Sequence, residues 1–375
     1  MGNIWPIYRK ALALMPRHGK LNDGDIEKKR EAEKILRKHR CIGATFCTFD
    51  GEKVTGIGAF GYARKGVPAG FGTVYRIASV SKLVTAMGAM RLQEKGALTL
   101  DGDVNEYFPI SLRHPKAPET PITLRMLMSH TAGIHDGADY NSGIAKNVPL
   151  SVLLQGDSFC THLPGKIWEY SNFGAGIAGA VMEAAAGMDF EALMQKEVFS
   201  PLGVQATFYP QKVQGELADA TRILPPQKAP NFNAGERMAR PLPEETCDAE
   251  HHYNLAHGNL CISAENLAKL GRALMQPGFL TEESLQEMRK IICPFGERAH
   301  NLSQGVGTFI LQDASICSRP LYGHQGMAYG ACHGLFFDIE KQKGLVLLTS
   351  GVSEARDGVL SDVNKDLIRL YLSKE

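Results

Sequence analysis

The chain has 375 residues, of which 44% are hydrophobic and 22% are charged, as is ordinary for a soluble globular protein. Its 41 basic and 40 acidic residues leave a formal net charge of +1, so no overall field would recruit nucleic acid or an anionic membrane. A chain of this length predicts one large domain or two tightly joined layers.

Eight cysteines are scattered along the chain, and none of them forms a C-x-x-C pair. This scatter favours buried thiols in a reducing compartment over a disulfide framework or a zinc site, so we expect no metal and no cofactor. The cysteines stand at positions 41, 47, 160, 247, 261, 293, 317 and 332.

The first twenty residues, MGNIWPIYRKALALMPRHGK, contain only short apolar runs, broken by Pro6 and Pro16 and by basic residues. Such a segment lacks the apolar core of a signal peptide. No apolar stretch elsewhere approaches the length that a membrane crossing needs. We therefore expect a cytoplasmic protein without a membrane span.

Secondary-structure patterns begin with a helix over residues 25–39, where Ile35 and Leu36 belong to a narrow apolar stripe. Two strand-like runs follow, 41–50 and 53–63, and the Gly51 turn between them predicts a hairpin. The middle of the chain is mostly helical in pattern, with loops rich in proline and glycine. Examples of its predicted helices are 83–95, 124–128, 174–186 and 264–275.

Strand patterns return near the C-terminus and are followed by a final amphipathic helix, in which Leu360, Val363, Leu367 and Leu370 recur at helical spacing. The late strands are predicted at 306–311, 321–326, 332–339 and 345–349.

Strands at both ends with helices between them predict an α+β fold. We expect the terminal segments to share one antiparallel sheet that is flanked by helices, with a mostly helical central region. The prediction is a single domain over 1–375, with its α/β part at about 1–78 and 300–375 and its helical part at about 79–299.

The first motif with chemical content is Ser79-Val80-Ser81-Lys82, at the start of a helix-forming run. A lysine three residues after a serine lies on the same helix face, so Lys82 could reach the Ser79 hydroxyl and act as its base once burial removes its proton. The Ser79 N–H at the helix start could hold a developing oxyanion. The alternative is an N-cap serine followed by a surface lysine.

The second motif is Tyr170-Ser171-Asn172, on a loop that leads into the helix at 174–186. A phenol beside a lysine could carry protons to a leaving group, and the Asn172 amide could grip an amide substrate. A buried tyrosine beside an N-cap asparagine is the structural alternative.

The third motif is His324-Gln325-Gly326, on a late strand. Gly326 would let a substrate lie close to the strand edge, and the N–H of Met327 could be the second oxyanion donor. His324 would orient the site, or bind a substrate carboxylate when protonated. A lone strand histidine is more often structural.

Two other patterns suggest different chemistry. Residues 56–61 match G-x-G-x-x-G, but the glycines and proline that follow forbid the helix that a dinucleotide site requires. His251, His252 and His257 lack the spacing of metal ligands, so they are predicted to be surface histidines.

The chain resembles the serine β-lactamase and penicillin-binding protein family, which includes class C β-lactamases, D-aminopeptidases and carboxylesterases. The likeness extends over about 40–350, with the three motifs in the family's order. Matching stretches are FGTVYRIASVSKLVTAMGAMRLQEKGALTLDGDVNEYFP (71–109), ITLRMLMSHTAGI (122–134), PGKIWEYSNFG (164–174), SPLGVQATFY (200–209) and GHQGMAYG (323–330).

This resemblance implies catalysis by an acyl-serine intermediate, with Ser79 as nucleophile and Lys82 and Tyr170 as the general-base pair. It implies that Asn172 and the strand of His324 and Gly326 bind a small-molecule or short-peptide substrate with an amide or ester bond. A β-lactamase, a D-alanyl-D-alanine carboxypeptidase and a non-enzymatic sensor that is acylated without turnover are alternatives.

Two departures from the family refine this expectation. β-Lactamases of this class carry lysine where this chain has His324, which favours a peptidase or an esterase. Family members that act on the cell wall are exported, whereas this chain shows no signal peptide, which favours a cytoplasmic substrate.

Overall fold

The computed structural model describes residues 21–23, 25–223, 231–294 and 301–373. The N-terminal segment in which the sequence predicted no signal peptide lies outside the described residues. None of the helices in the described ranges combines the length and the apolarity that crossing a membrane requires.

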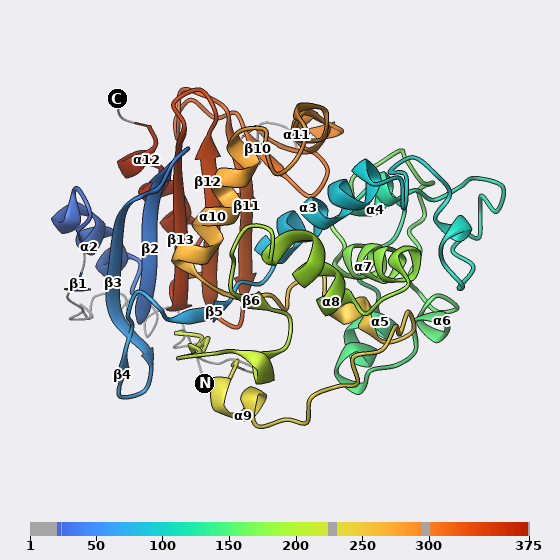
Figure 1. Cartoon of the computed structure of the whole chain (residues 1–375), viewed down its shortest axis with the longest axis horizontal. Coiled ribbons are helices and arrows are strands. Elements are labelled where there is room, and N and C mark those ends of the chain that lie inside the picture. The colour runs from blue at the N-terminus through green and yellow to red at the C-terminus, as the bar shows by residue number, and fades with distance from the viewer. Residues whose placement is uncertain (1–20, 24, 224–230, 295–300, 374–375) are drawn as a thin grey trace, which may run out of the picture.

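A long antiparallel sheet forms one side of the molecule (Figure 1). The short β4 (Val67–Pro68) pairs with β3 beside the main path of the sheet. The strand order along this path is β1 (Leu21–Asp23), β3 (Val54–Arg64), β2 (Gly43–Asp50), β13 (Lys343–Gly351), β12 (Ala331–Asp338), β11 (Leu321–Ala328), β10 (Phe309–Leu311), β9 (Leu302–Gln304) and β8 (Cys293–Pro294).

Strands from the N-terminal and C-terminal parts of the chain pair in the middle of this sheet. Strand β13 pairs with β2 in antiparallel register, with Leu347 opposite Phe46. Strands β2 and β3 form the hairpin predicted around Gly51. The predicted α+β fold with a sheet shared by the terminal segments is therefore confirmed.

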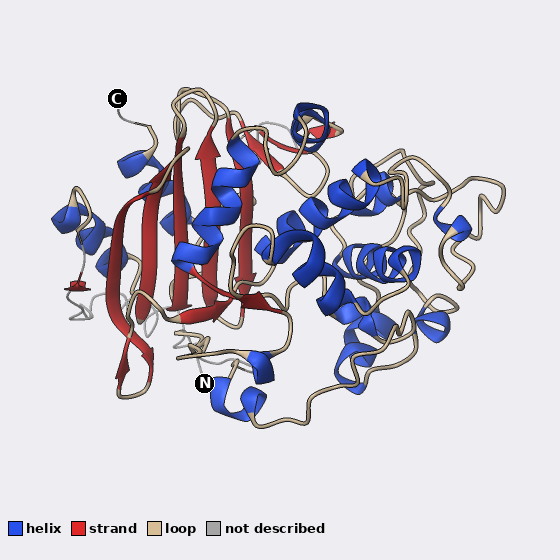
Figure 2. Ribbon diagram, viewed as in Figure 1, coloured by secondary structure: helices blue, strands red, loops and turns tan. Residues whose placement is uncertain are grey.

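Helices cover both faces of the sheet (Figure 2). On one face, α2 (Lys29–Lys38) and α12 (Asp362–Tyr371) bury Leu36 and Leu367 in one apolar cluster with Phe46. Burial of this apolar area is the main force that holds the helices on the sheet.

The opposite face is covered by α10 (Ala264–Met275), whose Gly271 lies so close that an added Cβ would stand 2.6 Å from the Phe49 ring. The predicted bounds of α10 are confirmed. Its place differs from the predicted division of the chain, which assigned it to the helical region, because the apolar stripe of α10 packs on the sheet.

The helical region is built around α3 (Val80–Glu94), which is buried along most of its length. The apolar residues of α3 are distributed around the helix rather than along one stripe, as is typical of a helix in an interior. The other helices are α4 (Leu124–Met128), α5 (Ala138–Gly143), α6 (Leu150–Leu153), α7 (Asn172–Ala186), α8 (Phe190–Met194), α9 (Ala234–Met238) and α11 (Glu282–Arg289). A small sheet of β5 (Val74–Arg76), β7 (Cys261–Ser263) and β6 (Ala206–Thr207) lies between the two regions.

One predicted strand is wrong. Residues 306–311 were expected to form a single strand, but the structure has β9 and β10 with a turn between them. Gly307 adopts a φ of +60°, and a Cβ there would lie 2.5 Å from the Ala86 side chain. The turn lets the chain approach α3 closely, which an extended strand with side chains could not do.

Two further patterns behave as predicted. The G-x-G-x-x-G match at 56–61 lies within β3 and opens no helix, so it is no dinucleotide fingerprint. All eight cysteines are free thiols, of which five are buried as predicted, while Cys160 and Cys293 are half-buried and Cys247 is exposed.

Candidate active site

Ser79 lies at the N-terminus of α3, where the helical region meets the sheet. The residue before it, Ala78, adopts a left-handed φ of +50°, a conformation that costs a non-glycine residue about 1 kcal/mol or more. The Ser79 hydroxyl makes no capping hydrogen bond to α3, so the N-cap alternative does not account for it. Among the described residues, its main-chain N–H also has no hydrogen-bond acceptor.

Lys82 is buried one turn further along α3, so the surface-lysine alternative is wrong. Its Nζ donates to Ser79 Oγ at 3.1 Å, to Asn172 Oδ1 at 2.8 Å and to the main-chain oxygen of His257 at 2.6 Å. Burial lowers the pKa of Lys82 to about 7, against the opposing influence of the Asp136 carboxylate. A neutral amine that can accept the Ser79 proton is therefore populated near neutral pH.

Tyr170 completes the group around the serine. Lys82 Nζ lies 5.0 Å from the centre of its ring. Burial raises the pKa of Tyr170 well above its usual value, and a hydrogen bond with Ser79 only partly offsets this. The phenol is therefore protonated in the resting site and can donate a proton. The His130 ring packs against it at 4.4 Å.

Asn172 is the first residue of α7, and its neighbour Ser171 caps that helix by accepting from Gly174 N at 2.9 Å. The Asn172 side chain is oriented by Asp136, whose Oδ2 accepts from Asn172 Nδ2 at 2.7 Å. The same carboxylate accepts from Phe173 N at 2.9 Å. With Nδ2 held by Asp136, the amide presents its oxygen to Lys82.

Strand β11 passes directly in front of Ser79. A Cβ on Gly326 would lie 2.2 Å from the Ile77 oxygen and 3.0 Å from Ser79 N, so only glycine fits this approach. Strand β10 pairs with β11 only as far as Gly323, which leaves the edge beyond it, including Met327, unpaired on that side among the described strands. An unpaired strand edge offers main-chain donors to a substrate.

His324 is buried and stacks on Phe309, with the ring centres 4.0 Å apart. Its Nδ1 donates to the Gln325 main-chain oxygen at 2.6 Å. Burial, together with the charge of Lys82, lowers the pKa of His324 to about 3. A neutral imidazole cannot attract an anion, so this geometry does not support the predicted carboxylate binding by protonated His324.

The structure brings Ser79, Lys82, Tyr170 and Asn172 together as the sequence predicted. Sequence reasoning missed three residues that position this group: His130, Asp136 and His257. His130 accepts from the Ser171 N–H at 3.2 Å through Nδ1. His130 lies within the stretch 122–134 on which the resemblance rests, and a closer reading of that stretch could have found it, whereas Asp136 lies two residues beyond its end. His257 contributes a main-chain oxygen, which no side-chain pattern reveals.

The prediction that His251, His252 and His257 are surface residues is wrong for His257, whose ring Nδ1 is buried, and for His252. Its side chain is only 10% exposed and contacts the buried carboxylates of Glu183 and Asp189. Both carboxylates come from residues more than sixty positions earlier in the chain, so no local spacing could have indicated the cluster.

The serine, the neutral lysine and the protonated phenol, placed between a helix N-terminus and a strand edge, define a serine acyl-transfer site. The chain belongs to the Beta-lactamase family, whose sequence profile matches residues 26–369. The family predicted from the three motifs is thereby confirmed.

The proteins to which this chain is similar include an esterase, a penicillin-binding protein and an amidase. It is 24% identical to Esterase EstB of Burkholderia gladioli over 369 residues, covering 90% of this chain and 93% of the esterase. It is 28% identical to Penicillin-binding protein 4* of Bacillus subtilis over 197 residues, which is 50% of this chain but only 42% of that protein. The solved structure of D-amino acid amidase from Ochrobactrum anthropi SV3 superposes with a TM-score of 0.69 at 22% identity, covering 91% of this chain and 97% of the amidase.

Proposed function

We propose that this protein is a serine hydrolase that cleaves an amide or ester bond through an acyl intermediate on Ser79. The observation that carries this proposal is the 3.1 Å contact between Lys82 Nζ and Ser79 Oγ, made by a buried lysine whose pKa burial lowers to about 7. A base with a pKa near the working pH is the most effective one for proton transfer.

In the acylation step, Lys82 accepts the Ser79 proton while Oγ forms a bond to the substrate carbonyl carbon. The N–H groups of Ser79 and Met327 stabilise the oxyanion. Tyr170 then donates its proton to the leaving amine or alcohol as the carbonyl bond to that group breaks, and Lys82 returns a proton to the phenol. The result is an acyl-serine and a neutral site.

In the deacylation step, a water molecule loses a proton to the same base pair and attacks the acyl carbon. The bond to Ser79 Oγ breaks, the serine regains a proton and the acid is released. Asn172 and the edge of β11 at Gly326 would hold the substrate. His324, neutral and stacked on Phe309, would act by orienting the strand rather than by carrying charge.

The substrate class that we propose is a small molecule or a short peptide, rather than nucleic acid. The names of two similar proteins, an esterase and an amidase, support an ester or amide bond. His324, at the position where related β-lactamases have lysine, argues against efficient β-lactam hydrolysis. A cytoplasmic location and a single domain over the whole chain are part of the same proposal.

The test is intact mass spectrometry after incubation with a fluorescent penicillin, together with turnover of p-nitrophenyl butyrate and nitrocefin. We expect labelling at Ser79, sustained ester turnover and little nitrocefin hydrolysis, all abolished in Ser79→Ala. Full activity in Ser79→Ala would refute the mechanism. Release of a single equivalent of product would instead identify a sensor that is acylated without turnover.

A further inference from the structure

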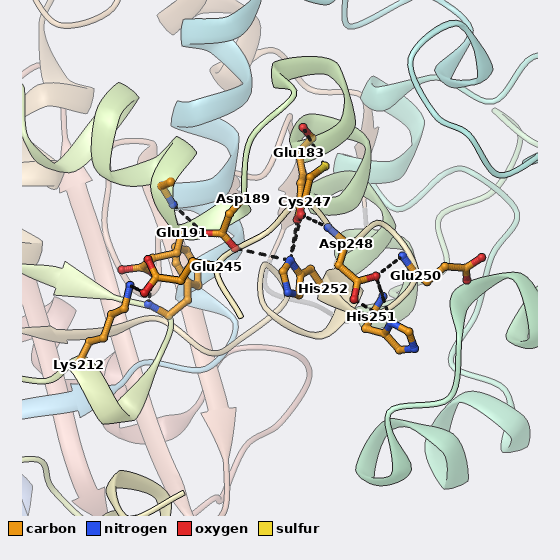
Figure 3. Close-up of polar contacts among 12 residues, drawn as sticks. Glu183, Asp189, Glu191, Lys212, Glu245, Cys247, Asp248, Glu250, His251 and His252 are labelled. Atoms are coloured by element: carbon orange, nitrogen blue, oxygen red, sulfur yellow. Dashed lines mark hydrogen bonds and ion pairs between the residues drawn. The ribbon is translucent and has the colours of Figure 1, made fainter. Parts of the chain in front are cut away.

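A second cluster of buried polar side chains lies at the other end of α7 (Figure 3). It consists of Glu183 on α7, Asp189 at the N-cap of α8 and His252 in the short helix His252–Asn254. Their side chains are 0%, 2% and 10% exposed, respectively. Ionisable side chains from three separate elements therefore lie together in the interior.

The donor atoms of these side chains are close enough to share one ligand. His252 Nδ1 lies 3.0 Å from each carboxylate oxygen of Glu183 and 3.7 Å from Asp189 Oδ2. One donor atom from each of the three residues falls within a group in which all separations are below 4.8 Å. Ligand atoms that lie about 2.0–2.2 Å from a tetrahedral metal ion are roughly 3.3 Å from one another. This spacing falls between the 3.0 Å and 3.7 Å distances from His252 Nδ1 to the two carboxylates.

Asp189 supplies the observation that points to a missing partner. Its Oδ1 caps α8 by accepting from Ala192 N at 2.9 Å. Its Oδ2 is buried, faces His252 and accepts no hydrogen bond from any described residue. A buried carboxylate oxygen that accepts no hydrogen bond is costly, and the His252 nitrogen 3.7 Å away is too distant to donate one.

With both carboxyl groups ionised, the three side chains of this cluster carry more negative than positive charge. Glu183 and Asp189 carry up to two negative charges, and His252 supplies at most one positive charge. The lysine drawn in Figure 3, Lys212, pairs with Glu245 at 2.8 Å and not with these carboxylates. A divalent ion would neutralise both carboxylates and occupy the space that they face.

We propose that Glu183, Asp189 and His252 bind a divalent transition-metal ion of the Zn²⁺ type. An imidazole nitrogen together with carboxylate oxygens selects such ions over Mg²⁺ and Ca²⁺, which prefer oxygen ligands alone. In binding, His252 Nδ1 gives its lone pair to the metal and any proton on that nitrogen leaves to solvent. This site departs from the sequence-based expectation of no metal.

The location assigns the ion a structural role. Glu183 lies eleven residues after Asn172, which is about 16 Å along α7 from that active-site residue at 1.5 Å per residue. His252 begins the segment that ends at His257, whose main-chain oxygen accepts from Lys82. The metal would join this segment to α7 without touching the reacting atoms, and hydrolysis itself requires no step on it.

The experiment uses the full chain, stripped with a chelator and then titrated with Zn²⁺ alone. We expect one equivalent by calorimetry and by elemental analysis after gel filtration, with weaker binding of Mg²⁺. His252→Gln and Asp189→Asn should each weaken Zn²⁺ binding at least tenfold. His251→Gln is the matched control, because the neighbouring histidine pairs with Asp248 outside the cluster and should leave binding unchanged.

Two further measurements keep the test independent of folding defects and of catalysis. Ser79→Ala should bind Zn²⁺ as the wild type does. Co²⁺ bound to the wild type should show visible bands without a sulfur-to-metal charge-transfer band, because the Cys247 Sγ near the cluster contacts a main-chain oxygen, at 3.9 Å. No stoichiometric Zn²⁺ uptake, equal uptake by His252→Gln, or a sulfur band would each overturn the site.

Discussion

The two ends of α7 carry buried polar clusters with different charge arrangements. At its start, Lys82 is separated from the Asp136 carboxylate by the Asn172 amide, which bonds to both. At its other end, His252 contacts the carboxylates of Glu183 and Asp189 directly. The neutral amide of Asn172 orients Lys82 without placing a negative charge in contact with its nitrogen. Two carboxylates in direct contact with His252 instead favour a bound cation.

The largest expected effect comes from replacing Lys82, at the active-site end of α7, with a side chain that always carries a positive charge. Lys82→Arg keeps the positive charge but removes the proton acceptor, because an arginine side chain stays protonated in proteins. We expect kcat/KM for p-nitrophenyl butyrate to fall by about 10³-fold, within the usual range for loss of a general base. Lys269→Arg is the control, because this α10 lysine donates to the Gly203 oxygen, and a Lys82→Arg enzyme within tenfold of wild type would exclude Lys82 as the base.

The close approach of β11 distinguishes the active-site end from the other end of α7. Gly326→Ala would place a Cβ 2.2 Å from the Ile77 oxygen and push the strand away from Ser79. We expect kcat to fall by about 10²-fold, as when an oxyanion donor is lost. In the control Gly72→Ala, the added Cβ meets no atom within 4 Å. Equal kcat values for the two variants would show that β11 does not form part of the oxyanion site.

The pH profile of the wild-type enzyme reports the pKa of Lys82, which would be higher if a carboxylate contacted its nitrogen directly. Burial lowers the pKa of Lys82 to about 7, and only the neutral amine accepts a proton, so activity should rise with pH through that value. We expect kcat/KM to drop about tenfold for each pH unit below 7. A flat profile between pH 6 and 8 would mean that another group limits the reaction.

The smallest effect should follow removal of the carboxylate behind Asn172. The negative charge of Asp136 raises the pKa of Lys82, so Asp136→Asn should move the acid limb of the kcat/KM profile to lower pH, by no more than about one unit. It should also lower kcat a few-fold, because the Asn172 amide loses a charged anchor. Asp139→Asn is the control, because this α5 residue is exposed, and a shift of the Asp136→Asn profile to higher pH would contradict this electrostatic role.

Much of the fold could be predicted because its signals are local. Alternating runs around Gly51 and helical spacing at 264–275 lie within single elements, so periodicity alone identified β2, β3 and α10. A sheet shared by the terminal segments followed from strands at both ends of the chain, whereas the pairing of β13 with β2 came from the structure. The turn at Gly307 could not be predicted, because its cause is contact with Ala86, far away in sequence.

The same division applies to the two polar clusters. The sequence by itself determined the pairing of Ser79 with Lys82, because residues three apart share a helix face, and the order of the three motifs indicated the family. Only the tertiary structure decided that Lys82 is buried, that Asp136 holds Asn172, that His324 is stacked and neutral, and that Glu183 meets His252 across 69 positions. Burial and long-range contact set these charges, and both arise only when distant segments pack together.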